Sequence, residues 1–154
     1  RFMLKVIVKY PKKEEERQII RMNNSGEFPT VNPVIKPEDI VRARSVVRDV
    51  YMDEKIERYI VDIVYATRTP DDYGLGKIKD FISFGASPRA SISLSMASKA
   101  YAFIKRRGYV IPEDVRAVCN EVLRHRIGLT YEAEAENVTT EQIIAEVINA
   151  VQVP

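Results

Sequence analysis

Residues 84–108 read FGASPRASISLSMASKAYAFIKRRG, and they decide the fold because they mark out one complete helix. Ser87 is a residue type that caps helices, and Pro88 suits the first helical position. Apolar residues then recur at helical spacing, as Ala90, Leu94, Ala97, Tyr101 and Ile104. Basic residues followed by Gly108 are typical of a helix end. The stretch predicts an amphipathic helix with one buried face.

Further helices are predicted on both sides of this stretch. Pro37 begins one, Asp53 caps the next, Pro112 begins another, and Thr139 with Gln142 forms a capping box for the last. Their predicted inner residues are Ile40, Ala43, Val47, Val50 and Tyr51; Ile56, Ile60, Ile63 and Val64; Val115, Val118, Cys119, Val122 and Leu123; and Ile143, Ile144, Val147, Ile148 and Val151. A short helix is expected over residues 78–84. The predicted fold is therefore mainly α.

Strand signals are weak and scattered. Residues 2–10 alternate with apolar side chains on both faces, which is typical of a strand inside a covered sheet. No strand of similar strength follows nearby, so its sheet partners are expected to lie outside this chain. Residues 109–111 are expected to form a short strand, and residues 127–136 a one-sided strand. Between the first strand and Pro37 we expect a helix over residues 12–23 and an irregular linker over residues 24–36.

Composition excludes several classes of protein. The chain has 154 residues, 45% of them hydrophobic and 30% charged, with a net charge of +2, which is an ordinary globular mixture without the basic excess of a dedicated nucleic-acid binder. No apolar run approaches the roughly 20 residues of a membrane-spanning helix. The single cysteine, Cys119, fits a reducing compartment such as the cytoplasm, and it lies on the apolar stripe of its helix. One cysteine and one histidine, His125, cannot build the usual zinc sites. A carboxylate-only site is the alternative, but the acidic residues show no binding-loop spacing, so we expect no metal site.

Arg89 is the candidate binding residue. It follows Ser87 and Pro88 in the first helical turn, where free N–H groups and the helix dipole already create positive charge. An arginine is locally unfavourable there unless an anion is bound, which makes Arg89 a candidate phosphate ligand. The alternative is a solvated surface arginine that tolerates a small repulsion.

Several short motifs occur together in an informative order. Gly85-Ala86-Ser87-Pro88-Arg89-Ala90 is similar to the sensor 2 motif of MoxR-type AAA+ ATPases. The other matching segments are Arg1-Phe2-Met3-Leu4, Tyr10-Pro11 followed by Glu14-Glu15-Glu16-Arg17, Ala66-Thr67-Arg68, Tyr109-Val110-Ile111-Pro112-Glu113-Asp114-Val115, and Leu123-Arg124-His125-Arg126. Only Ile111 departs, where the family pattern has Thr. The chain thus resembles the C-terminal part of this family over its whole length.

The resemblance implies both a fold and a set of residue roles. Residues 1–33 would be the end of the AAA+ core, with its last strand and the following helix, and residues 34–154 the helical lid with a short strand or hairpin element. Arg89, with Pro88 beside it, would be the sensor 2 arginine that reaches the γ-phosphate of ATP. Arg1 would be an arginine finger presented to a neighbouring subunit, and Tyr10 and Pro11 would lie beside the adenine. The alternative for Tyr10 is a core aromatic residue at the end of the strand.

The resemblance also implies what the full-length protein does. It would bind ATP and Mg²⁺, hydrolyse ATP in a homo-oligomeric ring of about six subunits, and remodel partner proteins, often ones with von Willebrand factor A-type domains, in the bacterial cytoplasm. Neither a phosphate-binding loop nor an acidic pair for Mg²⁺ is found in this sequence. The chain alone is therefore expected to bind no cofactor and to be inactive, and it is expected to start partway through the protein. The alternative is a free-standing helical nucleic-acid-binding or adaptor domain, suggested by Lys105-Arg106-Arg107 beside a possible strand pair.

Overall fold

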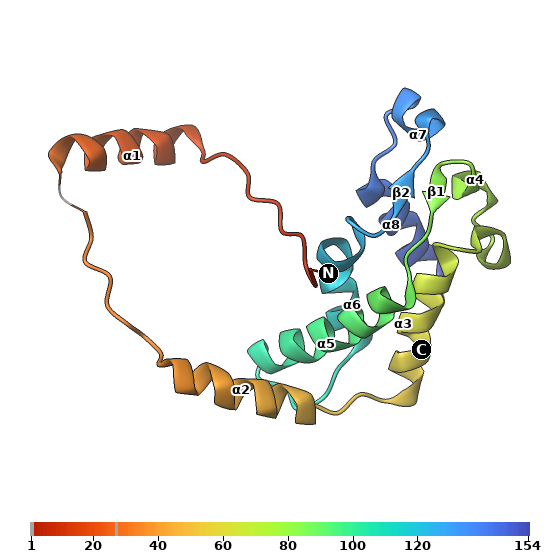
Figure 1. Ribbon diagram of the computed structural model, residues 1–154, viewed down its shortest axis with the longest axis horizontal. Helices are drawn as coiled ribbons and strands as arrows, with labels where there is room; N and C mark the ends of the chain where they lie inside the picture. The colour runs from red at the N-terminus through yellow and green to blue at the C-terminus, as the bar shows by residue number, and fades with distance from the viewer. Residues whose placement is uncertain (1, 27) are drawn as a thin grey trace.

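The computed structural model describes residues 2–26 and 28–154. Within them the chain forms helices and two short strands: α1 (Lys13–Ser25), α2 (Pro37–Asp49), α3 (Glu54–Ala66), the 3₁₀ helix η1 (Pro70–Tyr73), α4 (Gly76–Lys79), β1 (Ile82–Phe84), α5 (Pro88–Ile104), α6 (Pro112–Leu123), β2 (Gly128–Leu129), α7 (Tyr131–Ala135) and α8 (Thr140–Ala150). We call residues 37–154 the bundle, and residues 2–26 with 28–36 the arm. Figure 1 shows the arm looping away from the bundle.

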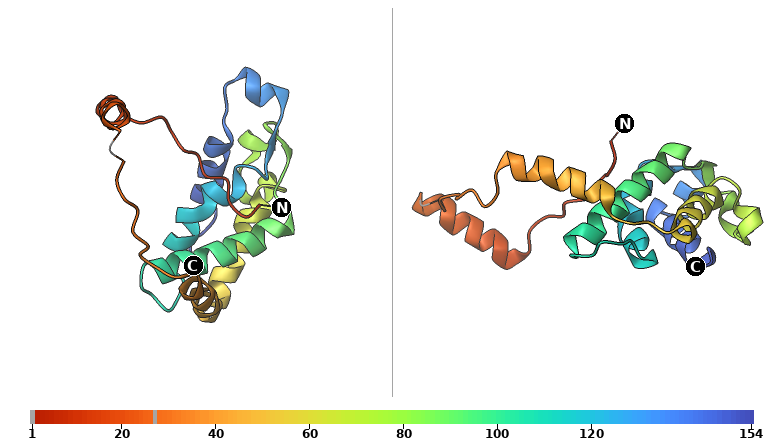
Figure 2. Two further views of the ribbon diagram at one scale, coloured as in Figure 1. Left: turned by 60° about the vertical axis from the view of Figure 1, so that its left-hand side comes forward. Right: turned by 90° about the horizontal axis from the view of Figure 1, so that it is seen from below.

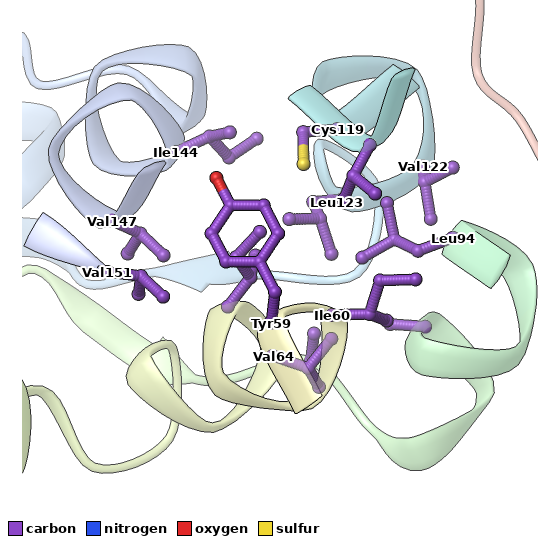
Figure 3. Packing of buried hydrophobic residues seen from close by; sticks show 14 of the residues in the cluster. Tyr59, Ile60, Val64, Leu94, Cys119, Val122, Leu123, Ile144, Val147 and Val151 are labelled. Carbon is purple, nitrogen blue, oxygen red and sulfur yellow. The ribbon is translucent and has the colours of Figure 1, made fainter. Parts of the chain in front are cut away.

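The core of the bundle lies among α3, α5, α6 and α8 (Figure 3). The predicted inner face of α3 is fully buried, and α3 begins where expected because the Asp53 carboxylate accepts the Lys55 N–H at 2.9 Å. Leu94 on α5, Leu123 on α6 and Ile144 on α8 are equally buried. The prediction of a mainly helical bundle is confirmed.

The connection from α5 to α6 is fixed by a buried carboxylate. Asp114, which is 1% exposed, pairs with the Arg107 guanidinium and accepts the Ile111 N–H at 3.0 Å. The strand expected over residues 109–111 is reduced to a single bridge between Tyr51 and Tyr109. Arg107 belongs to the basic run that suggested nucleic-acid binding, and it is engaged within the protein.

Two predictions about the other end of the bundle were wrong. Residues 78–84 do not form one helix, because α4 ends at Lys79 and β1 pairs antiparallel with β2. Residues 127–136 do not form a long strand either. The Thr130 hydroxyl accepts the Ala133 N–H at 3.3 Å and starts α7, whose alanine and glutamate residues favour a helix. A short tertiary pairing and a local cap therefore override the alternating pattern.

The arm contains one helix and no strand among its described residues. The strand predicted over residues 2–10 is extended chain, since no neighbouring strand is present to accept its hydrogen bonds. The Lys5 N–H of this segment donates to the Glu121 carbonyl of α6 at 2.8 Å. Helix α1 buries none of its residues and lies apart from α3, α5, α6 and α8 in all three views (Figure 1 and Figure 2).

Candidate functional site

The site is built around the first turn of α5. Arg89 is the second residue of this helix and is exposed to solvent. Ser87 has the extended backbone of a cap residue, but its hydroxyl caps no N–H group, and the first turn contains no acidic residue. The positive end of the helix dipole therefore has no anionic side chain of its own.

A second arginine lies close to Arg89. Arg126 follows the end of α6, and its guanidinium donates to the Val122 carbonyl at 2.9 Å and to the Ser93 hydroxyl of α5 at 3.0 Å. Partial burial lowers the pKa of Arg126, and the positive charge of Arg89 lowers it further. Among the described residues, no carboxylate forms an ion pair with either arginine. The two cations therefore create a field that favours a bound anion.

Arg126 and His125 also hold the start of the arm. The Phe2 carbonyl accepts a hydrogen bond from the Arg126 guanidinium at 2.8 Å, and the His125 Nε2 atom lies 3.1 Å from the same oxygen. His125 Nδ1 is buried without a hydrogen-bond partner in the part of the chain that the structure describes. The Nε2 atom is thus the one that carries the proton toward Phe2. The arm is clamped where the α6 end meets α5.

The segment directly before α5 is anchored by Thr67, the C-cap residue of α3. The Thr67 hydroxyl accepts the Ala86 N–H at 2.9 Å and donates to the Val64 carbonyl at 2.7 Å. Sequence reasoning assigned no role to Thr67 or Arg126, although both lie in short motifs that it singled out. Thr67 contacts Ala86, which is 19 residues away, and Arg126 contacts Ser93, which is 33 residues away. A local sequence pattern does not reveal contacts over such separations.

The structure separates the sequence-predicted site residues. Pro88 occupies the first position of α5, beside Arg89. Tyr10 is 99% exposed, and Pro11 is also exposed; both directly precede α1 in the arm, so the structure does not bring them to Arg89. Arg1 lies outside the described residues. The roles of these residues in nucleotide binding stay predictions.

Cys119 is a core residue, as its place on the apolar stripe predicted. It is fully buried, and burial raises the pKa of its thiol to about 12, which keeps it protonated and unreactive near neutral pH. In residues 2–26 and 28–154, no cluster of three or more histidine, cysteine or acidic residues is placed to hold a metal ion. No helix in these ranges is long and apolar enough to cross a membrane.

Comparison with known proteins gives one consistent result. Residues 77–147 match the family model of the AAA lid domain. The whole chain is 38% identical to the chaperone MoxR1 of Mycobacterium tuberculosis and 36% identical to the YeaC protein of Bacillus subtilis. A crystal structure of a proposed ATPase from Cytophaga hutchinsonii superposes with a TM-score of 0.93 at 39% identity. The chain spans 41%, 46% and 47% of these three proteins, respectively, which is less than half of each.

Proposed function

We propose that this chain, which is similar to the MoxR-type AAA+ ATPases and matches the AAA lid domain over residues 77–147, is the nucleotide-responsive lid of an ATPase. Arg89 is the residue that contacts the γ-phosphate of ATP. One observation carries this proposal: Arg89 is an exposed cation at the positive end of α5, and no carboxylate of the described residues neutralises it.

The chemistry of the site favours a phosphate group that changes during a reaction cycle. Arg89 belongs to the same first turn of α5 as the free N–H groups, so a γ-phosphate bound at this turn gains charge-assisted hydrogen bonds. Such bonds contribute about 1.5–3 kcal/mol. ADP lacks this phosphate and loses the contact, so the lid favours one position with ATP and relaxes after hydrolysis.

The other groups that the reaction needs belong, in this proposal, to the rest of the full-length protein. In our proposal a phosphate-binding loop and an acidic pair outside this chain hold ATP and Mg²⁺, and Arg1 acts as an arginine finger toward a neighbouring subunit. Tyr10 and Pro11 contact the adenine when the arm is packed against an ATPase core. The protein works in the cytoplasm as a ring of about six subunits. It uses the movement of the lid to remodel partner proteins, including ones with von Willebrand factor A-type domains.

Substitution of Arg89 in the full-length protein tests the proposal. Arg89→Ala is expected to lower ATP turnover at least tenfold and to reduce the preference for ATP over ADP, while the lid stays folded because the side chain is exposed. Arg89→Lys should recover turnover only in part, since a point charge does not replace a planar fork. Arg44→Ala, which removes an exposed arginine from α2, is the matched control and should leave turnover unchanged. Wild-type turnover and an unchanged ATP-to-ADP affinity ratio in Arg89→Ala would refute the proposal.

A further inference from the structure

The end of α3 carries a buried hydroxyl with two backbone partners. Thr67 is 1% exposed, and its hydroxyl donates to the Val64 carbonyl and accepts the Ala86 N–H at 2.9 Å. Ala86 is fully buried as well. A buried N–H group without a partner is costly, so this one side chain satisfies a backbone group that water cannot reach. The hydroxyl therefore ties the segment before α5 to the end of α3.

Gly85 brings the two backbones into direct contact. A Cβ atom at this position would lie 2.3 Å from the Thr67 carbonyl oxygen and 2.7 Å from the Cγ atom of Arg68. Both distances are far inside van der Waals contact, so only glycine allows the approach. Together, the Thr67 hydrogen bond and the Gly85 contact fix residues 85–86 against the end of α3.

This anchor lies directly before the start of α5. Only Ser87 and Pro88 separate Ala86 from Arg89, and the proline ring restricts the backbone between them. Arg89 is exposed and has no ion-pair partner among the described residues, so no neighbouring carboxylate directs its side chain. The backbone that the anchor holds therefore sets the position from which the Arg89 side chain leaves the bundle.

We propose that Thr67, acting through Gly85 and Ala86, is a positioning residue for Arg89. The inference rests on the proposed contact between Arg89 and the γ-phosphate. Thr67 itself does not contact the nucleotide. It keeps the first turn of α5 at a fixed place relative to α3, so that Arg89 is already positioned when the phosphate binds. A hydroxyl at residue 67 is required, and the methyl group of the threonine is not.

Three substitutions separate positioning from general stability. Thr67→Val keeps the shape but removes the hydroxyl, and Thr67→Ser keeps the hydroxyl. Thr130→Val is the matched control, because the Thr130 hydroxyl also donates to a carbonyl, that of Asp80 at 2.8 Å, and accepts an N–H group, that of Ala133. Thr130 lies before α7, on a different connection of the bundle. Thermal unfolding of all three variants verifies that they are folded before activity is measured.

ATP turnover of the full-length protein is the first readout. Thr67→Val is expected to lower turnover about tenfold, since small misplacements of a catalytic group have effects of this size or larger. Thr67→Ser and Thr130→Val should stay within about twofold of the wild type. The double variant Thr67→Val, Arg89→Ala should be no slower than Arg89→Ala alone, because the positioning matters only while Arg89 is present. Losses that multiply, or a Thr67→Val variant with wild-type turnover beside a slow Arg89→Ala, would overturn the proposal.

A second variant covers the case in which Thr67→Val does not fold. Gly85→Ala displaces the same backbone without removing a hydrogen-bonding side chain, and it should show the same tenfold loss and the same lack of additivity with Arg89→Ala. Wild-type turnover in a folded Gly85→Ala variant, beside a slow Arg89→Ala, would equally overturn the inference.

Amide exchange in the 154-residue chain distinguishes the two possible failures. If Arg89→Ala keeps wild-type turnover, the proposed function of Arg89 is refuted. The contact between Thr67 and Ala86 is then tested by amide exchange alone, without an activity measurement. In Thr67→Val, exchange of the Ala86 amide should then be at least about tenfold faster, and the Arg89 amide resonance should shift. Thr130→Val should change neither. An Ala86 amide that exchanges as slowly in Thr67→Val as in the wild type would refute the anchor itself.

Discussion

The arm and the bundle contain the same kind of amphipathic pattern with opposite outcomes. Helix α1 in the arm and helix α3 in the bundle have the same length, and both carry isoleucine residues, Ile19 and Ile20 in α1 and Ile56, Ile60 and Ile63 in α3. Helix α3 buries six residues, whereas α1 buries none, and its Ile19 and Ile20 are 54% and 56% exposed. The comparison shows that a local pattern determines the helix, while burial depends on a second apolar surface, which α5, α6 and α8 supply to α3.

The largest expected difference between the two regions is in amide hydrogen exchange. Amides of Ile63 and Val64 in α3 should exchange only through global opening, whereas those of residues 6–9 should exchange at least about a thousandfold faster. The Lys5 amide, bonded to Glu121, should be intermediate. Exchange should be measured together with the molecular mass in solution, because an unpaired extended segment can also pair with a second copy. Protection over residues 6–9 equal to that of α3 in a monomer would remove the distinction.

Cysteine labelling makes the same comparison with a chemical probe. The raised pKa of Cys119 keeps the thiol protonated in the folded chain. Its contribution to the free energy of unfolding is therefore complete at pH 8, and it is lost as the pH rises from about 9 toward 12, where the unfolded chain loses this proton more readily. At pH 8 a thiol reagent should therefore modify Cys119 only upon unfolding. In a Cys119→Ala background, Val8→Cys places a thiol at an arm position that is 90% exposed, and labelling there should be at least about a hundredfold faster. Comparable rates would mean that the core opens readily.

The bundle could be predicted from the sequence, because its helices carry strong local signals. Asp53, Pro37 and the Thr139–Gln142 capping box each start a helix at the predicted place. The strand signals failed, since the pairing of Ile82 with Leu129 depends on two segments far apart in the sequence and Thr130 caps a helix within the alternating stretch.

The site could be predicted only in part. The exposure of Arg89 was expected from its position in the first turn of α5, but its binding role and the boundary between residues 33 and 34 stay predictions. The contacts that Thr67 and Arg126 make with Ala86 and Phe2 are invisible without the fold, because they join elements that only tertiary packing brings together.

Truncation of a core side chain should show how strongly the bundle depends on its packing. Leu123 is fully buried on α6, and Leu123→Ala leaves a cavity among α3, α5 and α8. The free energy of unfolding is expected to fall by about 2–5 kcal/mol. Chemical denaturation monitored by circular dichroism measures this loss. A decrease below about 1 kcal/mol would indicate that the core of the bundle is loosely packed.

The hydrogen bond between Arg126 and Phe2, which joins the arm to the bundle, should contribute less to the free energy of unfolding. Arg126→Gln removes the charged donor to the Phe2 carbonyl, and the free energy of unfolding should fall by about 1 kcal/mol. The more specific result is that the amide resonances of residues 2–5 should move to the positions of an unfolded chain. Arg116→Gln is the control, because Arg116 lies on α6 but donates to Asn149 within the bundle. Resonances of residues 2–5 that move equally in both variants would contradict a clamp specific to Arg126.

The smallest effect is expected for the arm helix itself, and it tests the comparison most directly. Ile19→Ala removes as many carbon atoms as a core truncation, but the side chain is more than half exposed in both the folded and the unfolded chain, and no buried residue of α1 packs against it. Alanine also has a higher helix propensity than isoleucine, which offsets the small loss of contact area. The free energy of unfolding of this chain should therefore change by less than about 0.5 kcal/mol, against 2–5 kcal/mol for Leu123→Ala. A loss above about 2 kcal/mol in the isolated chain would mean that α1 packs on the bundle in solution. Under the proposed function, the same substitution should be more costly in the full-length ATPase, because a core packed on the arm would cover Ile19. Equal and negligible effects in both proteins would show that the apolar face of α1 has no partner in either.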